Sequence, residues 1–265
     1  MPSALRQPQL FEPSLAACYT GPLANFTPPL IGGTPPLEAF NTARWRDAHW
    51  LKEDLSRFAE QYPGGDLRAV VSIWSKWHLS ALTVPTLTAN LLLNRDLPVG
   101  LDDMQVIFND KGATSRLWLP HEGTPITTQD PFERFATLIE QHWAPLIEQL
   151  AAISGAAQRV FWSNAGGYLD FYVNALGEHP LASQQAFEAA KALLEARNLP
   201  NGKRNPLFQP VRYFTPKGSE EVKRVRKLCC LRYLLDEFDT CGTCPLRAAT
   251  WRRANAPNKP PVNAV

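Results

Sequence analysis

Residues 70–93 read VVSIWSKWHLSALTVPTLTANLLL, the most apolar stretch of the chain. Four residues interrupt its apolar character: Lys76, His78, Pro85 and Asn90. A bilayer span needs roughly 20 mainly apolar residues, so the stretch indicates a buried core helix and no transmembrane segment. Asp66 suits the N-cap of a helix that continues to about Asn94. Pro85 lacks an N–H, so it is predicted to break or kink this segment into a core helix pair.

Two tryptophans, Trp74 and Trp77, lie three positions apart in this segment. Helical spacing puts them on one face, and such a pair is more often buried than exposed as a ligand platform. Upstream, residues 37–62 carry apolar side chains at helical spacing and end in a Pro-Gly-Gly stop, which predicts another helix.

Further elements follow downstream. Residues 104–108 and 115–119 are β-like runs around a turn and predict a hairpin. A helix is predicted over 130–153, because Asp and Pro at its start suit the N-cap and first position, with a kink at Pro145. The next stretch is predicted as a strand at 159–164, a turn at Gly166-Gly167 and a helix at 168–176. A helix at about 183–197 and strands at 211–214 and 222–228 complete the prediction.

Long helices with a few scattered strands predict an α+β fold, with a mainly helical body and a small antiparallel sheet. Hydrophobic residues make up 45% and charged residues 20% of the 265 residues, which is ordinary for a globular chain. The net charge of +2 excludes a wholly basic nucleic-acid binder but allows a local basic patch.

The N-terminal region is rich in proline, with eight of the 24 prolines before position 40. Residues 1–36 are therefore expected to form an extended, turn-rich arm. Met1 to Phe11 has no apolar core behind a basic start, so no secretory signal is expected. The protein is expected in the cytoplasm, and a peripheral contact with the inner membrane stays open.

Four of the five cysteines fall within sixteen residues: Cys229, Cys230, Cys241 and Cys244. Secreted disulfide scaffolds are short and spread their cysteines, so this tight group indicates a metal or redox site. Cys18 stands alone and is expected to be a small packed residue, not a ligand.

Four thiolates are the ligand set of either a [2Fe–2S] cluster or a structural zinc. The second pair is a conventional chelate, in which Gly242 lets the chain turn tightly. Adjacent cysteines project to opposite faces of an extended chain, so the first pair lacks the relaxed bite typical of zinc modules. Spacing alone leaves iron–sulfur and zinc near parity, with a strained disulfide well behind.

Residues 203–232 contain nine basic side chains and two acidic ones. A four-cysteine cluster is an anion that gains negative charge on reduction, so nearby cations would stabilise its reduced form. The same charges could guide an acidic electron donor or an anionic substrate. A solvated basic strand without a special role explains any single residue equally well.

The pattern Cys-Cys-x10-Cys-x2-Cys resembles that of the FhuF-type ferric siderophore reductases. Residues 72–77 with Val84-Pro85 look like the tryptophan-rich central segment of that family. Residues 160–164 with 167–169 look like its Trp-Ser-Asn segment, and 205–208 like a short stretch before the cysteines.

The resemblance implies a [2Fe–2S] cluster held by Cys229, Cys230, Cys241 and Cys244, in an enzyme that takes iron from imported siderophores, typically hydroxamates. We divide the chain into an arm (1–36), an α+β siderophore-reductase body (37–215), a cluster-binding segment (216–247) and a flexible tail (248–265), of which the arm and the tail match nothing in the family. One-electron reduction of Fe(III) to Fe(II) weakens the bonds to hard oxygen donors.

No G-x-G-x-x-G fingerprint is visible, so no NAD or flavin site is expected in this chain. A separate ferredoxin-like protein or small reductant should therefore supply the electrons.

No catalytic residue is expected beyond the cluster, and three residues are candidates for siderophore binding: Trp162, Asn164 and Tyr168. Ligand groups often gather where a strand opens into a helix, as predicted here. A core tryptophan and a capping asparagine explain two of them equally well. The five histidines show no ligand spacing and receive no role.

Two alternatives stay open. A non-enzymatic electron shuttle or redox sensor would carry the same cluster without turning over siderophore. A zinc-stabilised binding module would use the basic strand to meet a partner, although no nucleic-acid motif is recognised.

Overall fold

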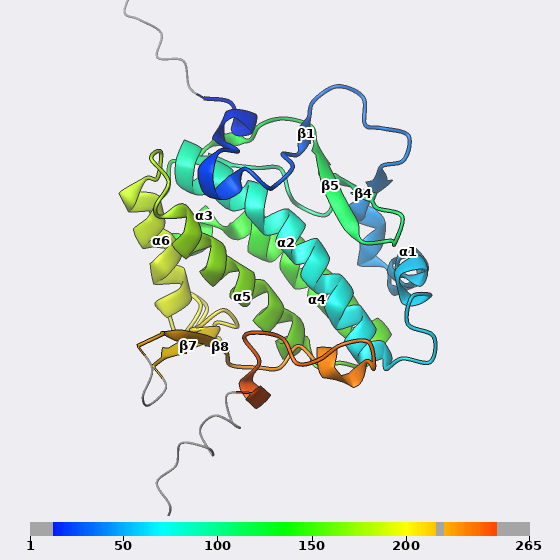
Figure 1. Ribbon diagram of the computed structural model, residues 1–265. Helices are drawn as coiled ribbons and strands as arrows, with labels where there is room; N and C mark the ends of the chain where they lie inside the picture. Colours follow the sequence, from blue (N-terminus) through cyan, green and yellow to red (C-terminus); the bar gives the residue numbers. More distant parts are fainter. Residues whose placement is uncertain (1–12, 216–219, 248–265) are drawn as a thin grey trace, which may run out of the picture.

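The computed structural model describes residues 13–215 and 220–247. The predicted tail and the first twelve residues of the predicted arm lie outside the described residues. Figure 1 shows how the elements are arranged. The helical elements are η1 (Leu15–Cys18), η2 (Gly21–Leu23), η3 (Thr42–Arg46), α1 (Ala48–Ala59), α2 (Leu67–Leu93), α3 (Pro131–Arg134), the π-helical η4 (Thr137–Trp143), α4 (Ala144–Ser154), α5 (Gln158–Leu176), α6 (Gln184–Glu195) and η5 (Arg232–Leu234). The strands are β1 (Leu30–Ile31), β2 (Phe40–Asn41), β3 (Arg95–Asp96), β4 (Gln105–Phe108), β5 (Thr114–Leu119), β6 (Thr124–Pro125), β7 (Val211–Phe214) and β8 (Lys223–Arg226).

Helix α2 is the central element of the fold and packs along α5, with α1, α4 and β5 also against it (Figure 1). The predicted cap is confirmed, because the Asp66 carboxylate accepts a hydrogen bond from the Arg68 N–H at 2.9 Å. Asn94 ends the helix in the left-handed conformation. Most side chains between these ends are buried, so apolar contacts hold α2 from several sides.

Helix α2 continues through Pro85, so the predicted division into two helices is wrong. A proline in a helix interior costs about 3 kcal/mol. Burial of large apolar side chains on either side is worth about 1.5–3 kcal/mol each, which outweighs that cost. Three hydroxyls near the proline also donate to helix carbonyls four residues earlier: Thr83, Thr86 and Thr88.

Trp74 and Trp77 do not share a buried face, contrary to the prediction. Trp74 is fully buried and stacks on His78, whereas the Trp77 side chain is 57% exposed. Side chains three residues apart differ by about 60° around a helix axis. That rotation is enough to move Trp77 from the core to the rim of a surface hollow.

A buried pair of histidines, His78 and His142, joins α2 to η4. Their Nε2 atoms lie 2.8 Å apart, while His142 Nδ1 lies 2.6 Å from the Val99 carbonyl and His78 Nδ1 lies 3.0 Å from Thr114 Oγ1. Because a carbonyl only accepts, His142 donates from Nδ1, His78 donates from Nε2 and the threonine hydroxyl donates to His78. Burial lowers the pKa of both rings, to about 4 for His142.

The largest sheet has the strand order β1-β5-β4-β2. The predicted hairpin is confirmed, since β4 and β5 run antiparallel with Gln105 opposite Trp118. The short β1 runs parallel to β5, so the sheet is mixed and not wholly antiparallel. The proline-rich segment that carries β1 also contributes Leu15, Cys18 and Leu23 to the buried core.

The helix predicted over 130–153 is divided into α3, η4 and α4, and the irregularity comes just before Pro145 as expected. Pro145 has no N–H to offer the carbonyl of Gln141 four residues earlier. The Leu101 N–H donates to that carbonyl instead, at 3.2 Å. The π-helical turn is thus tied to the segment that leads into β4.

A single helix, α5, covers the stretch predicted as strand, turn and helix, so the predicted strand and the glycine turn are wrong. Its buried apolar side chains recur at helical spacing: Phe161, Ala165, Leu169, Tyr172, Val173 and Leu176. Gly166 serves close packing, because a Cβ there would lie 2.7 Å from the Cβ of Pro210.

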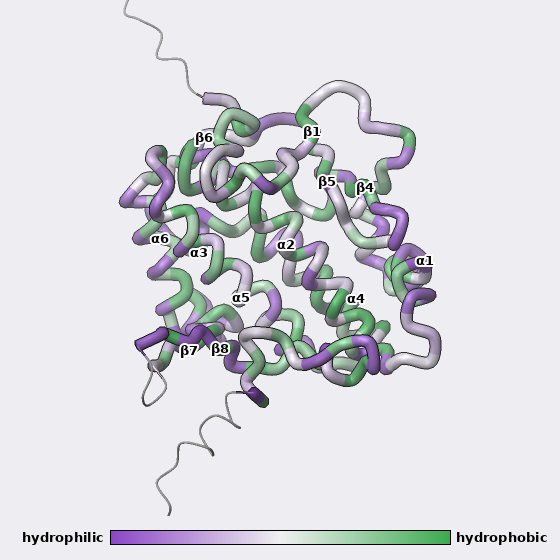
Figure 2. The backbone as a smooth tube through the Cα atoms, viewed as in Figure 1, coloured by the Kyte–Doolittle hydropathy of each residue, from purple (hydrophilic) through white to green (hydrophobic). Residues whose placement is uncertain are grey.

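The remaining predicted elements are confirmed, β7 with the predicted bounds and the others with shorter ones. The helix predicted over 37–62 is α1, preceded by the 3-10 turn η3. Ser183 caps α6, which ends at Glu195. Strands β7 and β8 form an antiparallel pair with Val211 opposite Arg226, and Figure 2 shows them as a hydrophilic band at the base of the molecule.

The predicted fold class, a mainly helical α+β body with a small sheet, is confirmed. None of the helices in 13–215 and 220–247 combines the length and apolar character that crossing a membrane requires.

The glycine pair of α5 gives a matched test of this packing. We expect Gly166→Ala to lower the free energy of unfolding by about 1–3 kcal/mol, because its new methyl group collides with Pro210. The measurement is denaturant unfolding of the purified protein followed by circular dichroism.

Gly167→Ala is the control, because its Cβ would meet only Arg226 Nε, at an ordinary 3.7 Å. Alanine is the better helix former by about 1 kcal/mol, so this variant should be as stable as the parent or more stable. Equal effects of the two substitutions would contradict the close approach of α5 to Pro210.

Candidate metal centre

The four clustered cysteines belong to the segment that follows β8. They lie together beside the N-terminal part of α2, where Ser72 contacts Cys230. Cys230, Cys241 and Cys244 are buried, and Cys229 is half-buried against them. The sulfurs of Cys230 and Cys241 lie 3.8 Å apart. All are free thiols. In the described part of the chain, no three or more His, Cys, Asp or Glu side chains are arranged as ligands of a single metal ion.

Backbone contacts bring the two cysteine pairs together. The Cys244 N–H donates to the Cys241 carbonyl at 3.0 Å, which closes the second pair into a turn. The Arg226 N–H donates to the Thr243 carbonyl at 2.9 Å and fixes this turn to β8. Gly242 lies outside the left-handed region, so the turn does not depend on its conformational freedom. Instead Leu231, after the first pair, takes the left-handed conformation with φ of 61°.

A buried network of polar side chains ties the cysteines to the helices. Ser72 Oγ of α2 donates to the Cys230 carbonyl at 2.8 Å. The Asn164 amide of α5 donates to Ser72 Oγ at 3.1 Å and to Ser75 Oγ at 2.9 Å. The Asn164 oxygen accepts from the guanidinium of Arg226. Asn164 therefore joins α2, α5 and β8 at one point.

Arg226 is a buried cation next to the cysteines. Its side chain is 5% exposed and donates from Nη2 to Asn164 and to Ser163 Oγ, while its Nε has no partner among the described residues. No carboxylate within 13–215 and 220–247 forms an ion pair with it. An uncompensated buried charge is costly, so this arrangement calls for an anion beside Arg226.

The charges of Lys76 and Arg226 act on the thiols. Hydrogen bonding with Cys229 and then with Cys241 lowers the pKa of the Cys230 thiol, and the positive charges of Lys76 and Arg226 act in the same direction. Cys230 therefore favours the thiolate, which is the form that binds metal, whereas hydrogen bonding to Cys230 and burial raise the pKa of Cys229 and of Cys241.

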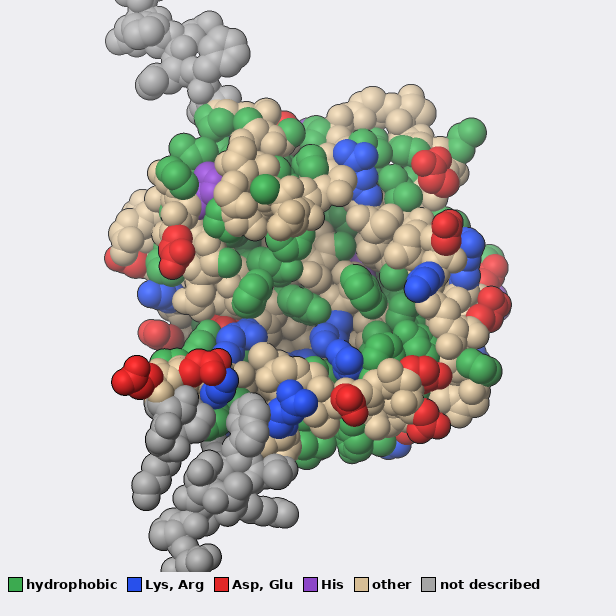
Figure 3. Space-filling model, viewed as in Figure 1, with side chains coloured by type: hydrophobic (Ala, Val, Ile, Leu, Met, Phe, Trp, Pro, Cys, Tyr) green, Lys and Arg blue, Asp and Glu red, His purple; other side chains and the backbone are tan. Residues whose placement is uncertain are grey.

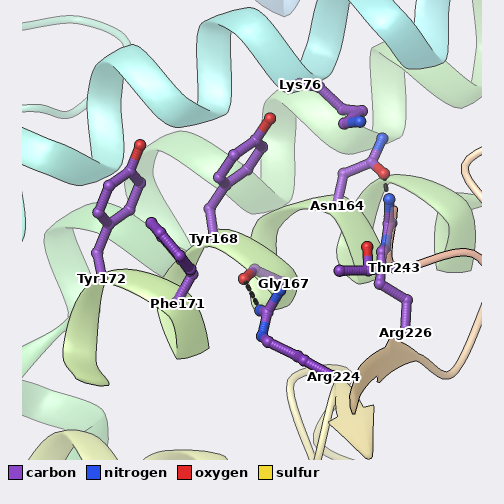
Figure 4. Close-up of a pocket in the computed structure, with 9 residues that line it drawn as sticks. All are labelled: Lys76, Asn164, Gly167, Tyr168, Phe171, Tyr172, Arg224, Arg226 and Thr243. Atoms are coloured by element: carbon purple, nitrogen blue, oxygen red, sulfur yellow. Dashed lines mark hydrogen bonds between the residues drawn. The ribbon is translucent and has the colours of Figure 1, made fainter. Parts of the chain in front are cut away.

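A pocket of about 220 Å³ opens beside the cysteine turn (Figure 4). Cations from α2 and β8 face aromatic side chains of α5 across it. Arg224 Nε donates to Asp170 Oδ2 at 2.9 Å, which holds this arginine at the rim. The pocket is lined by Lys76, Asn164, Gly167, Tyr168, Phe171, Tyr172, Arg224, Arg226 and Thr243.

A larger hollow of about 650 Å³ adjoins this pocket, because Lys76 and Tyr168 line both. Lys111 and Arg232 add two more cations to its wall, and within the described part of the chain no residue that lines either hollow is acidic. Figure 3 shows Lys and Arg side chains gathered along the lower edge of a hollow in the face in view. Together the two spaces form an electropositive groove beside the cysteines.

The three residues predicted to bind siderophore are divided between two sides of α5. Asn164 and Tyr168 line the pocket, although the Asn164 amide is already bonded within the protein. Burial raises the pKa of Tyr168, so its phenol stays protonated. Trp162 is half-buried and faces different hollows, near Phe208.

Lys76 and Arg226 were not predicted as site residues, although the sequence carried signals for both. Lys76 and Ser72 lie four residues apart in an otherwise apolar helix, which marks a polar stripe. Arg224 and Arg226 lie two apart in a strand, so they share one face. The residues of α5 that these arginines contact could not be inferred from spacing, because that stretch was predicted as a strand, a turn and a separate helix.

Comparison with known proteins fits this arrangement of helical body and cysteine segment. Residues 72–221 match the family described as ferric iron reductase FhuF-like transporter, so the chain belongs to the FhuF family. Residues 226–246 match the FhuF 2Fe-2S C-terminal domain. The chain is also 26% identical, over 219 residues and 80% of each chain, to a ferric siderophore reductase of Escherichia coli (strain K12).

The second match assigns a [2Fe–2S] cofactor to the cysteine segment. The residues present fit that group, because four thiols are gathered there, three of them buried, beside the Arg226 guanidinium, whose Nε has no hydrogen-bond partner among the described residues. The donor set is the Cys₄ set that such clusters take.

The structural role of Asn164 can be tested by unfolding the protein, without any siderophore present. We expect Asn164→Ala to lower the free energy of unfolding by about 2 kcal/mol or more, because Arg226, Ser72 and Ser75 lose buried partners. The measurement is anaerobic denaturant unfolding.

Asn174→Ala is the matched control on the same helix, because Asn174 is exposed and its amide serves mainly the Asp170 carbonyl. That variant should lose less than about 1 kcal/mol. If both variants lose equally little, Asn164 is not the junction that its contacts indicate.

Proposed function

We propose that this protein is a ferric siderophore reductase, as its relative from Escherichia coli is named. The observation that carries the proposal is the position of the four thiols beside a cationic groove wide enough to receive part of a chelate. A carrier that only exchanges electrons with other proteins has no need of such a groove.

Cys229, Cys230, Cys241 and Cys244 are the proposed ligands of the cluster. Their grouping supports this assignment. Ser72 holds the Cys230 carbonyl against α2, Arg226 holds the Thr243 carbonyl against β8, and the Cys244 N–H closes the second pair by donating to the Cys241 carbonyl. A [2Fe–2S] cluster, when bound, supplies single electrons.

Lys76 and Arg226 have a proposed electrostatic role at this site. Reduction adds one negative charge close to two cations, one of which is buried without a carboxylate partner. Positive charge in a water-poor site stabilises the added electron and raises the reduction potential. The neutral Asn164–Ser72–Ser75 network holds Arg226 in place without cancelling its charge.

The groove lined by Tyr168 and Lys76 is the proposed substrate site, and the substrate is a Fe(III) siderophore. We assign the hydroxamate type, which rests on the family resemblance, and Asn164 and Tyr168 are the members of the predicted set that line this groove. Aromatic side chains of α5 suit the apolar linkers of a chelate, and the cations suit its oxygen donors. Trp162 faces the other side of α5, so in this proposal it does not touch the chelate.

The proposed reaction transfers one electron from the protein to Fe(III), which becomes Fe(II) while the siderophore stays intact. Fe(II) holds hard oxygen ligands more weakly and exchanges them more readily. A separate donor, a ferredoxin-like protein or a small reductant, returns one electron to the protein. We place this reaction in the cytoplasm.

The test of function is a single-turnover experiment. Anaerobically reduced protein is mixed with a ferric trihydroxamate, and we expect its visible spectrum to return to the oxidised form with one chelatable Fe(II) per electron transferred. A ferric catecholate serves as the comparison substrate and should react more slowly.

A coloured protein that is inert toward both chelates would contradict the reductase function and favour an electron shuttle or sensor. Equal rates with both chelates would leave the reductase function standing but contradict the hydroxamate assignment.

The proposed ligand set predicts the behaviour of cysteine variants. Replacing any one of the four by serine should remove most of the iron and the visible colour, because serine is a poor substitute for a thiolate ligand. Iron content and absorption are measured after anaerobic purification.

Cys18→Ala is the control, because Cys18 is buried in the core far from the other thiols. This variant should keep its iron and its colour. Loss of iron in Cys18→Ala, or full retention in one of the four serine variants, would contradict the assignment.

A further inference from the structure

A second basic hollow, of about 840 Å³, lies on the other side of α5 from the substrate groove. We define the Phe208 surface as Arg159, Trp162, Lys203, Arg204, Phe208 and Lys227, all of which line this hollow. None of the described residues that line it is acidic. Arg159, Lys203 and Arg204 are exposed, whereas Trp162, Phe208 and Lys227 are half-buried.

Cations crowd around the Phe208 ring. Lys227 Nζ lies 4.7 Å from its centroid, and the guanidinium carbons of Arg204 and Arg197 lie 5.4 and 5.9 Å from it. Burial lowers the pKa of Lys227, and the nearby charges of Arg212 and Arg204 lower it further. No ion pair within 13–215 and 220–247 neutralises these cations.

Like charges crowded around the Phe208 ring, with Trp162 lining the same hollow, are typical of a docking surface. Protein interfaces favour aromatic side chains and Arg at their centre, and like charges without counterions suit a partner of opposite sign. Arg197 and Arg212 approach the site without lining the hollow, so the positive charge extends over an area broader than one small anion covers.

The Phe208 surface is joined directly to the cysteine segment. Leu228 lines the hollow and immediately precedes Cys229, the least buried of the four thiols. Lys227 fixes this connection, because its N–H donates to the Pro210 carbonyl at 3.0 Å and its Nζ to the Phe208 carbonyl at 3.1 Å. The substrate groove, by contrast, opens beside Thr243, which lies in the turn between Cys241 and Cys244.

We propose that the Phe208 surface docks an acidic one-electron carrier protein of the ferredoxin type, on the side of the cysteine segment opposite the siderophore. This inference rests on the proposed reductase function, because a reductase must receive an electron before each turnover. The carrier loses one electron and this protein gains one, and no proton or group is transferred. Separate faces let the carrier bind while siderophore occupies the groove.

The test uses charge reversal at two exposed positions, Lys203→Glu with Arg204→Glu. Reduction of the full-length, cluster-loaded protein by a reduced acidic [2Fe–2S] ferredoxin is followed by stopped-flow absorption at low ionic strength. We expect the second-order rate constant to fall at least about tenfold and to lose its salt dependence. The control reverses two exposed charges on α1, Lys52→Glu with Arg57→Glu, and should react like the parent.

Two further measurements exclude trivial causes. Photoreduction by a neutral deazaflavin should proceed equally in all three proteins, because it needs no docking. Oxidised cytochrome c, a basic carrier, should take electrons from the Lys203→Glu, Arg204→Glu variant faster than from the parent. Such a gain cannot come from misfolding.

Equal ferredoxin rates in parent and variant would overturn the docking proposal, as would an equal loss in the α1 control or in photoreduction. Electron entry is read from the protein's own spectrum, without siderophore. A parent that accepts electrons at the Phe208 surface but leaves ferric siderophore unreduced would therefore overturn the reductase function alone.

Discussion

The hydrogen bonds of Asn164 are the constraint on which the site depends. This one amide, buried in α5, holds the Ser72 and Ser75 hydroxyls of α2 on one side and the Arg226 guanidinium of β8 on the other. Ser72 in turn fixes the Cys230 carbonyl. Two packed helices thereby set the position of a cysteine segment that has little regular structure of its own. Apolar packing makes α2 rigid, and the hydrogen bonds of Asn164 fix how α2, α5 and β8 are aligned with one another.

Electrostatics explains why a buried arginine is tolerated at this junction. A guanidinium removed from water without a counterion costs several kcal/mol, more than its neutral hydrogen bonds return. The thiolates nearby are the natural counterions, and they too are unstable in a buried site without positive charge. Arg226 and the cysteines are therefore mutually dependent, and neither is well placed without the other.

Local signals in the sequence predicted much of the fold. Asp66 and Asn94 mark the ends of α2, and alternating β-like runs around a tight turn mark the hairpin, because caps and turns depend on a few adjacent residues. The α5 stretch failed because a short apolar run around residue 160 suits strand and helix alike, and its helical period emerges only over nineteen residues. The four cysteines were evident from their spacing. The contact between Asn164 and Arg226 was not, because it joins residues 62 positions apart that meet only in the folded chain.

The buried histidine pair makes the stability of the helical scaffold fall in acid. His142 has a pKa of about 4 in the folded chain, against about 6.5 when unfolded, so the unfolded chain binds more protons between these values. The stability that this ring contributes is complete above about pH 6.5 and is lost as the pH falls toward 4. Protonation would also place a positive charge and an unmatched N–H donor between α2 and η4, where Val99 and Thr114 already bond to the other ring nitrogens. The contact between α2 and η4 is therefore strongest near neutral pH and weakens in acid.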